Sequence, residues 1–321
     1  MKKKIRFIFS AITILAFLSG CQKKEMNSSA NIYYTAIESG TYYEGWANQL
    51  QEQAASYGFA FDAGYAENSV ETQDSQIKNA AAEGCNVLLC GLVSPDTVTA
   101  VKAAADHMPI VFINNAPDNS QLKKDRYIYV ASDEFMAGQY QAEFILEQFQ
   151  DKDVINLAIL KGPKGASGTN GRTNGLKRTL KASGKKINYV FEDYAGWNTE
   201  TAQELIALFL KTGSPVDCVA ANNDDMALGG LAAFEQAGIN TDSILFLGVD
   251  ASEAGCQAIA EGRMDFTVYQ PMSAQISAAI EAAGKLAAGQ SIQEIEGASE
   301  DGKYILIPFE KVDIHNVAQY Q

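Results

Sequence analysis

Short apolar runs that alternate with helical patterns are the feature that most constrains how this chain folds. In the first half of the 321 residues, apolar runs predict strands at 32–36, 59–63, 86–90, 110–113 and 127–130. Helices are predicted over 43–57 and 70–83, and a third opens at Ser94 and Pro95, a good N-cap followed by a proline at the first helical position. Parallel strands need a crossover connection, so this order predicts a parallel sheet covered by helices.

The second half repeats the pattern. Strands are predicted at 154–160, 186–191, 217–221, 244–249, 266–269 and 304–307, the last closing the chain. Helices are predicted over 199–210, 225–237, 252–261 and 273–288, with one more after the glycine-rich stretch 162–175. At ~150 residues per domain the chain has room for two doubly wound α/β lobes. Open parallel sheets bind ligands beyond the carboxyl ends of their strands, so functional residues are expected just after strands.

Residues 1–20 have the layout of a secretory signal: a basic start, an apolar stretch over 7–18 and then small residues. The apolar stretch is too short to span a bilayer. Leu18-Ser19-Gly20-Cys21 resembles the lipobox of bacterial lipoproteins, in which the cysteine becomes the lipidated first residue of the mature chain. We therefore predict a lipid anchor at Cys21 and a tether over 21–30; the alternative is an ordinary leader that contains a cysteine.

Composition excludes several classes of function. The chain has 25 basic and 39 acidic residues, a net charge of −14, whereas a nucleic-acid binder needs the opposite sign. Two histidines, His107 and His315, leave little material for His-based catalysis or a multi-His metal site. The remaining cysteines are expected to be buried, small hydrophobic residues without a disulfide; they are Cys85, Cys90, Cys218 and Cys256.

The residues that follow the predicted strands are aromatics, amides, one cation and carboxylates. They are Tyr42, Tyr43, Asn114, Asn115, Arg172, Trp197, Asn223, Asp224, Asp250 and Gln270. Amides both donate and accept, a carboxylate accepts from two hydroxyls, and arginine donates in a planar fork. An aromatic face can cover the C–H side of a pyranose ring. The set lacks a nucleophile–base pair, so it favours binding of a neutral polyhydroxylated ligand over catalysis.

Four motifs carry a resemblance to a known family. They are Ala-Asn-Asn-Asp-Asp-Met-Ala-Leu-Gly at 221–229, Gly-Val-Asp at 248–250, Val-Phe-Ile-Asn at 111–114, and Lys161-Gly162 leading to Arg172. Over roughly 31–310 the chain resembles bacterial periplasmic sugar-binding proteins of the ribose and galactose/glucose type, the solute receptors of ABC importers. The resemblance implies the type I periplasmic binding protein fold, two lobes joined by a multi-strand hinge. The lobes would comprise 31–132 plus 271–296 and 133–270 plus 297–321.

The same resemblance implies roles for individual residues. Tyr42 or Tyr43 and Trp197 would lie on opposite faces of the sugar. The residues expected to bond its hydroxyls are Asn114, Arg172, Asn223 and Asp250, with Gln270 at a hinge crossing. Galactose/glucose receptors carry a histidine and an aspartate before the arginine, where this chain has Ala166 and Gly168, so the sugar stays open. Those receptors also have a calcium loop, for which 148–153 is too short; no metal or cofactor is expected.

Structural readings of these residues remain open. Trp197 could fill a core edge, Asp250 could serve a helix N-terminus, and Arg172 could be a surface charge. Asp224 and Asp225 are interpreted as charges of a helix N-terminus, and Trp46 as a core residue. The glycine-rich stretch 162–175 could be a phosphate-binding loop, but it lacks Gly-Lys-Ser/Thr at the required spacing. Ser167 could be a nucleophile, but it does not stand in a Gly-x-Ser-x-Gly motif.

The favoured function is a monomeric, lipid-anchored extracytoplasmic receptor that binds a hexose or pentose between closing lobes and delivers it to an ABC permease. One alternative is a sugar sensor that presents the closed form to a membrane kinase or chemoreceptor. Another is a secreted glycoside-acting enzyme, which needs two carboxylates ~5–9 Å apart. Only Asp250 is placed for that role.

Overall fold

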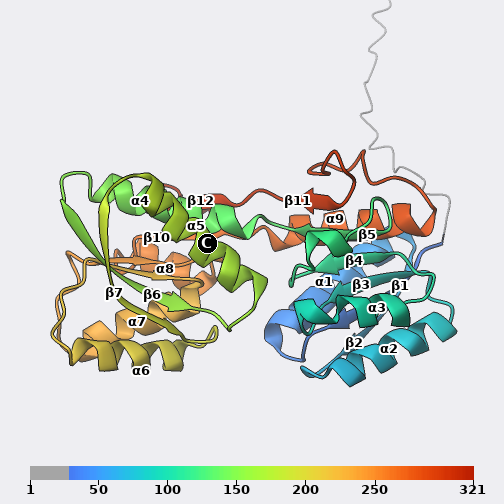
Figure 1. Ribbon diagram of the computed structural model, residues 1–321, viewed down its shortest axis with the longest axis horizontal. Coiled ribbons are helices and arrows are strands. Elements are labelled where there is room, and N and C mark those ends of the chain that lie inside the picture. The colour runs from blue at the N-terminus through green and yellow to red at the C-terminus, as the bar shows by residue number, and fades with distance from the viewer. Residues whose placement is uncertain (1–28) are drawn as a thin grey trace, which may run out of the picture.

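The computed structural model describes residues 29–321, which form two lobes that each contain one six-stranded sheet (Figure 1). The first sheet has the order β11-β5-β4-β3-β1-β2, and its neighbouring strands are all parallel. Its strands are β1 (Asn31–Ala36), β2 (Ala60–Tyr65), β3 (Val87–Gly91), β4 (Ile110–Ile113), β5 (Tyr127–Ala131) and β11 (Tyr304–Leu306). The helices that cover it are α1 (Thr41–Tyr57), α2 (Val70–Ala82), α3 (Val98–Ala104) and α9 (Met272–Ala287).

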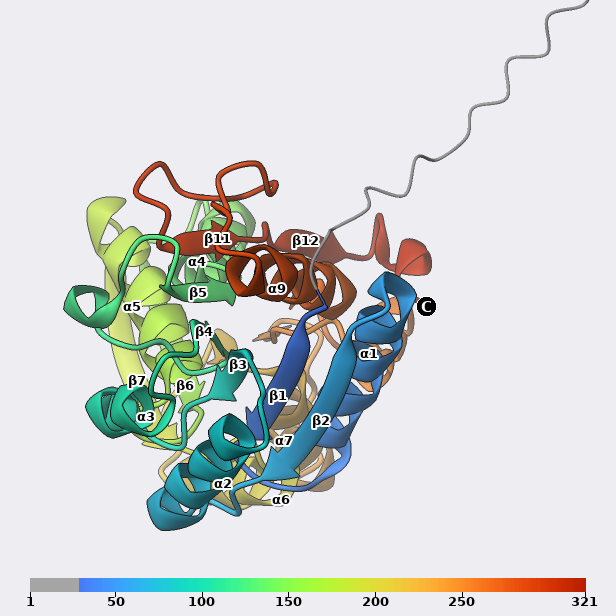
Figure 2. The same cartoon turned by 90° about the vertical axis from the view of Figure 1, so that its right-hand side faces the viewer.

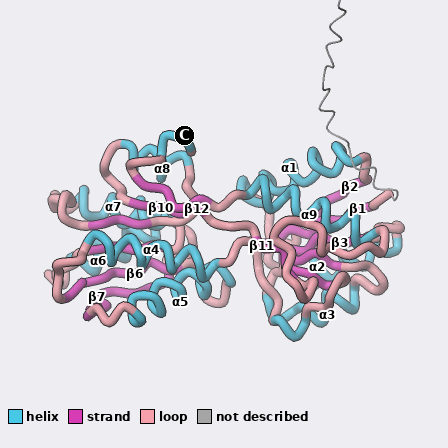
Figure 3. The backbone as a smooth tube through the Cα atoms, turned by 90° about the horizontal axis from the view of Figure 1, so that it is seen from above, coloured by secondary structure: helices cyan, strands magenta, loops and turns pink. Residues whose placement is uncertain are grey.

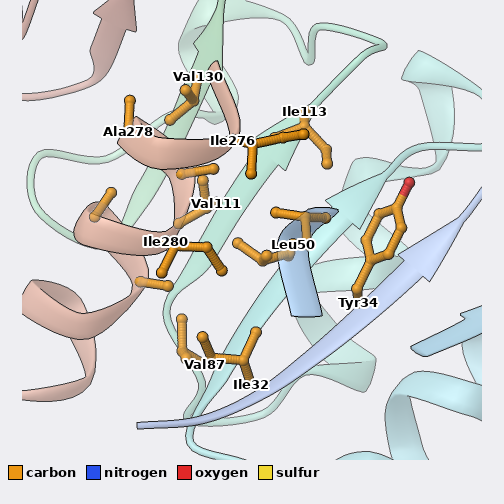
Figure 4. Close-up of a cluster of buried hydrophobic side chains, with 14 of the residues drawn as sticks. Ile32, Tyr34, Leu50, Val87, Val111, Ile113, Val130, Ile276, Ala278 and Ile280 are labelled. Carbon is orange, nitrogen blue, oxygen red and sulfur yellow. The ribbon is translucent and has the colours of Figure 1, made fainter. Parts of the chain in front are cut away.

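The first lobe has a hydrophobic core on each face of its sheet, because strand side chains alternate between the two faces. Figure 2 shows α1 and α9 on one side of the sheet and α2 and α3 on the other. On the α1/α9 side, Ile32 and Tyr34 of β1 pack in one cluster with Leu50 of α1 and Ile280 of α9 (Figure 4). Tyr33, the residue between them, belongs to the cluster under α2 and α3. The apolar run of β1 therefore holds both helix layers.

The second sheet has the order β12-β10-β9-β8-β6-β7, parallel except for the antiparallel edge strand β12. Its strands are β6 (Val154–Lys161), β7 (Lys186–Tyr194), β8 (Cys218–Ala221), β9 (Leu245–Leu247), β10 (Phe266–Tyr269) and β12 (Glu310–Asp313). Its helices are α4 (Glu134–Gln148), α5 (Ser167–Ala182), α6 (Thr199–Leu210), α7 (Asp224–Gln236) and α8 (Glu253–Ala260). One core cluster joins the sheet to α4 and α5, and another joins it to α6, α7 and α8.

The chain passes between the lobes three times: between β5 and α4, between β10 and α9, and between β11 and β12. Figures 1 and 3 show the lobes side by side along the long axis with these connections between them. The predicted fold class, two doubly wound parallel-sheet lobes joined by a multi-strand hinge, is confirmed.

Two details of the predicted C-terminal region are wrong. We placed 297–321 entirely with the second lobe, but β11 pairs with β5 in the first sheet, so the crossing lies between Leu306 and Glu310. The strand near 304–307 does not close the chain either, because β12 follows it and pairs with β10. Only Val312 of β12 is buried, which leaves little apolar pattern to detect. The strand β11 was detected, but its apolar pattern does not say which sheet it joins.

The glycine-rich stretch is mainly helix, because α5 begins at Ser167. Its glycines allow α5 to lie unusually close to α4. A Cβ at Gly171 would lie 2.4 Å from the Cβ of Glu134, and one at Gly175 would lie 2.0 Å from the carbonyl oxygen of Phe135. These positions must stay glycine for the helices to meet as they do, although glycine costs helix stability elsewhere. The close approach brings Glu134 to the side of α5 that carries Arg172.

The cysteine prediction is confirmed only in part. Cys90, Cys218 and Cys256 are buried and free, whereas Cys85 is free but partly exposed. Among residues 29–321 no helix is long and apolar enough to cross a membrane. The predicted signal, the lipidated Cys21 and most of the tether lie outside the described residues.

Candidate functional site

A cavity of about 860 Å³ lies between the two lobes and is lined by residues from both. All eight of the residues singled out from the sequence line it: Tyr42, Tyr43, Asn114, Arg172, Trp197, Asn223, Asp250 and Gln270. Ala166 and Gly168, which depart from the galactose/glucose pattern, also line it. The strand ends therefore converge on one site, as the parallel-sheet argument requires.

Three of these residues have backbone conformations that are rare for residues other than glycine. The φ angle is 60° at Asn114, 65° at Trp197 and 117° at Asp250. Such conformations persist only where the surroundings enforce them, and they cluster at functional sites. The carbonyl of Asn114 accepts bonds from the hydroxyls of Tyr129 at 2.8 Å and Ser167 at 3.1 Å. The amide of Asp250 donates to the carbonyl of Val268 at 2.8 Å. These bonds hold both residues in the orientation that faces the cavity.

Arg172 is at the centre of the polar network and is only 5 % exposed. Its Nε donates to Glu134 at 2.6 Å, and one Nη1 bond reaches the carbonyl of Asn222 at 2.6 Å. The other Nη1 bond reaches Asp250 at 3.4 Å, and Nη2 donates to Glu134 at 3.5 Å and to Gln270 at 3.3 Å. Burial opposes the charged form, but the carboxylates of Glu134 and Asp250 outweigh it and raise the pKa of Arg172. The surface-charge reading of Arg172 is therefore wrong.

Asp250 differs from an ordinary surface aspartate. Burial raises its pKa to about 6, the nearby Arg172 opposes the rise, and the charge of Glu134 adds to it. Its side chain is still 39 % exposed, and the exposed part faces the cavity. Its carboxylate is therefore available to a molecule in the cavity and sits in surroundings that disfavour its charge.

Asp224 lies in the first turn of α7, as its interpretation as a helix N-terminal charge requires, and it is also buried. Its Oδ1 accepts from the hydroxyl of Thr267 at 2.6 Å and its Oδ2 from the amide of Ser252 at 2.7 Å. Burial and the charge of Asp250 raise its pKa to about 7. These bonds tie α7 to the loop that carries Asp250. Asp225 does line the cavity.

Asn223 and Gln270 are each partly committed to the protein. Asn223 is the N-cap of α7, and its Oδ1 accepts from the amide of Met226 at 3.1 Å. Its Nδ2 is the group left for the cavity. Gln270 directly follows β10 at the second lobe crossing and accepts from Arg172. A residue at that place links the polar network to the hinge.

Aromatic rings border the cavity from both lobes. Tyr42 is 46 % exposed and meets Tyr43 edge to face, with ring centroids 5.1 Å apart. From the second lobe, Trp197 packs over Gly162, where an added Cβ would lie 2.3 Å from its ring, and the guanidinium of Arg172 is 5.7 Å from its centroid. Trp46 is fully buried under Tyr42, as its interpretation as a core residue requires.

A direct contact between the lobes closes one side of the cavity. The hydroxyl of Ser167, the first residue of α5, donates to the carbonyl of Asn114 at 3.1 Å and accepts from the amide of Ala116 at 3.2 Å. The backbone amide of Ser167 donates to Oδ1 of Asn115 at 3.5 Å. Sequence reasoning considered Ser167 only as a nucleophile and missed this role. Ser167 and its partners lie about 50 residues apart in the sequence, and only the folded chain brings them together.

Sequence reasoning also missed Glu134 and Asn222. Glu134 follows β5 by three residues, so the rule that functional residues follow strands covers it, but the rule was not applied at the lobe crossing. Asn222 directly follows β8; its carbonyl holds Arg172, and its Oδ1 accepts from the amide of Gly162 at 3.2 Å. Across residues 29–321, no group of three or more His, Cys, Asp or Glu side chains is arranged to hold a metal ion.

The family model and the relatives in sequence that match this chain are all binding proteins. The family model of the periplasmic binding protein domain matches residues 32–291. A putative rhizopine-binding protein of Rhizobium meliloti is 32% identical over 257 residues, 79% of this chain and 80% of the relative. A D-galactose/methyl-galactoside binding periplasmic protein of Haemophilus influenzae is 26% identical over 267 residues, 79% of this chain and 80% of the relative.

A solved structure matches nearly the whole chain. It is an ABC transporter solute binding protein of Bacillus halodurans with bound myo-inositol. The two share 26% sequence identity and a TM-score of 0.78, and the match covers 92% of this chain and 98% of that one.

Proposed function

This chain belongs to the periplasmic binding protein family, and on that basis we propose that it is an extracytoplasmic receptor that binds a sugar or a related polyol between its two lobes. Relatives in sequence are named for binding rhizopine and galactose, and a solved structure of the same fold holds myo-inositol. Galactose and myo-inositol are small and polyhydroxylated. Delivery to an ABC permease completes the proposal, since the matched structure is described as an ABC transporter solute binding protein.

The observation that carries the proposal is the composition of the interlobe cavity. It combines aromatic rings from both lobes with amides and a carboxylate that are held on strand ends. Rings cover the apolar faces of a cyclic polyol, and the polar groups pair with its hydroxyls. Closure then buries hydroxyls against matched partners, so a ligand that lacks one leaves a buried group unpaired, which confers specificity. The expected ligand contacts are Tyr42, Tyr43, Asn114, Arg172, Trp197, Asn223, Asp250 and Gln270.

Attachment to the membrane is proposed from the leader. Leu18-Ser19-Gly20-Cys21 would direct lipidation of Cys21, and the chain from 21 to 30 would tether the receptor near its permease. Mass spectrometry of the mature N-terminus tests this proposal. It should find an acylated Cys21, and replacing Cys21 with alanine should release the protein from membranes.

An enzymatic role has less support. Asp250 now has a second carboxylate near it, Glu134, since both contact Arg172. However, both oxygens of Glu134 accept bonds from Arg172, so this carboxylate is held as the partner of the arginine's charge. A glycosidase needs one carboxyl group that donates a proton and one that attacks or activates water. The relatives are solute-binding proteins.

A thermal-shift screen of pentoses, hexoses and inositols tests the proposed function. A ligand that binds only the folded state stabilises it by about 2.7 kcal/mol at a hundred times its Kd, which moves the melting temperature by several degrees. We expect at least one of these compounds to do so, and replacing Trp197 with alanine to remove most of the shift. If every compound leaves the melting temperature unchanged, the proposal fails.

A further inference from the structure

Next to Asp250, the central hydrogen-bond donor of the cavity, Arg172, is already used by protein groups. Arg172 has five N–H groups, and all five are directed to protein oxygens, two of them on Glu134. The amide nitrogen of Asn114 is likewise directed to a protein group, the hydroxyl of Tyr42 at 3.4 Å. Among the described residues, no protein group donates to Oδ2 of Asp250. A ligand must therefore bring hydrogen-bond donors to this region.

The charge of the cavity points the same way. Glu134 forms the shorter and two-pronged contact with Arg172, so it compensates most of the arginine's charge, whereas Asp250 reaches Arg172 only at 3.4 Å. The negative charge of Asp250 is thus largely uncompensated. The whole lining has five carboxylates against two cationic side chains. The carboxylates are Glu38, Asp96, Glu134, Asp225 and Asp250, and the cations are Lys164 and Arg172.

A neutral sugar can donate to Asp250 but cannot compensate its charge. A protonated amine does both, because it carries a full positive charge and three donors. The aromatic rings add to the match, since the faces of Tyr42 and Trp197 attract a cation that has been removed from water. Resting on the proposed function, we propose that the ligand of this receptor is a polyol or sugar that carries a protonated amine, with Asp250 as the acceptor of that amine.

Paired ligands test this inference by isothermal titration calorimetry on the purified protein. The pairs are D-glucosamine with D-glucose, D-galactosamine with D-galactose, and an aminodeoxyinositol with myo-inositol. At about pH 7 the amine of at least one pair should bind on the order of tenfold more tightly than its neutral partner, because a charge-assisted bond is stronger than a neutral one. Asp250→Asn should abolish this preference, whereas Asp242→Asn, on an exposed loop outside the cavity, should preserve it.

A second measurement needs no variant and so does not depend on whether Asp250→Asn folds. At about pH 5 Asp250 is largely protonated in the free protein, so the preference for the amine should shrink relative to pH 7. Other ionisable groups face Asp250 and enter the same titration. They are Arg172 of α5, Glu134 of α4, Asp224 and Asp225 of α7, and Tyr42 of α1.

The outcomes separate this inference from the proposed function. If the neutral member of every pair binds at least as tightly as its amine, the inference is wrong and the proposed function stands. A preference for the amine that persists unchanged in Asp250→Asn, or between pH 7 and 5, also overturns the role of Asp250. If no member of any pair binds a folded protein, the inference fails, and the proposed function fails with it when the thermal-shift screen is negative as well.

Discussion

Replacing Ser167 with alanine removes the hydroxyl that joins the two lobes. That hydroxyl makes two bonds across the cleft, to the carbonyl of Asn114 and from the amide of Ala116. At about 0.5–1.5 kcal/mol per net hydrogen bond, the closed form loses about 1–3 kcal/mol. The open form loses nothing, because water replaces both partners there. A ligand that needs the closed form should bind roughly 5- to 150-fold more weakly.

Calorimetry with the best ligand of the sugar screen measures this change, and small-angle scattering of the ligand-free protein should show a larger radius of gyration. Ser183→Ala is the matched control, because its hydroxyl bonds the carbonyl of Leu180 at 2.6 Å at the far end of the same helix. The reasoning is refuted if Ser167→Ala binds within twofold of the Ser183→Ala control.

Three further predictions follow from the geometry. Trp197→Ala should weaken ligand binding by about 2 kcal/mol and abolish any ligand-induced change in tryptophan fluorescence, since the other tryptophan is fully buried in the core; a fluorescence response that survives contradicts this. Gly175→Ala should lower the free energy of unfolding, measured by denaturant titration, by about 1–3 kcal/mol, because the added Cβ would meet the backbone of α4. Gly45→Ala, with open space around the added Cβ, should be neutral or stabilising. Equal effects of the two substitutions would contradict the close packing of α4 and α5. Burial raises the pKa values of Asp224 and Asp250 to about 7 and 6. Between about pH 4 and 7 the native state therefore holds more protons than the unfolded state, so the free energy of unfolding that these two groups contribute falls as the pH rises. In thermal melts, Asp224→Asn should reduce that fall, and an unchanged pH slope contradicts the assignment.

Much of the fold could be predicted because buried parallel strands are continuous apolar runs. The strands 110–113 and 266–269 and the helix 199–210 have the predicted bounds. The edge strand β12 was not predicted, because it buries a single side chain. The strand β11 was predicted at 304–307 but was assigned to the wrong lobe. The start of α5 was not predicted for another reason. Its glycines disfavour a helix locally, and they are needed there only because α4 packs so closely against α5.

The candidate site was predictable where a residue lies just after a strand. Asn114, Asn223 and Asp250, one to three residues beyond the ends of β4, β8 and β9, were found in this way. Glu134 and Ser167 were not found, because their roles depend on partners that lie 38 and 53 residues away in the sequence. The sequence alone predicts polar residues at strand ends, but it does not show which charged side chains pair with each other. The pairing of Arg172 with Glu134 leaves Asp250 available to the ligand.

A crystal structure of the protein grown with the best ligand of the screen tests the central claim most directly. We expect one polyol in the cavity between the lobes, bordered by Trp197 and Tyr42, with Asp250 accepting a bond from it. Ligand density on an outer surface of either lobe, with this cavity empty, would contradict it.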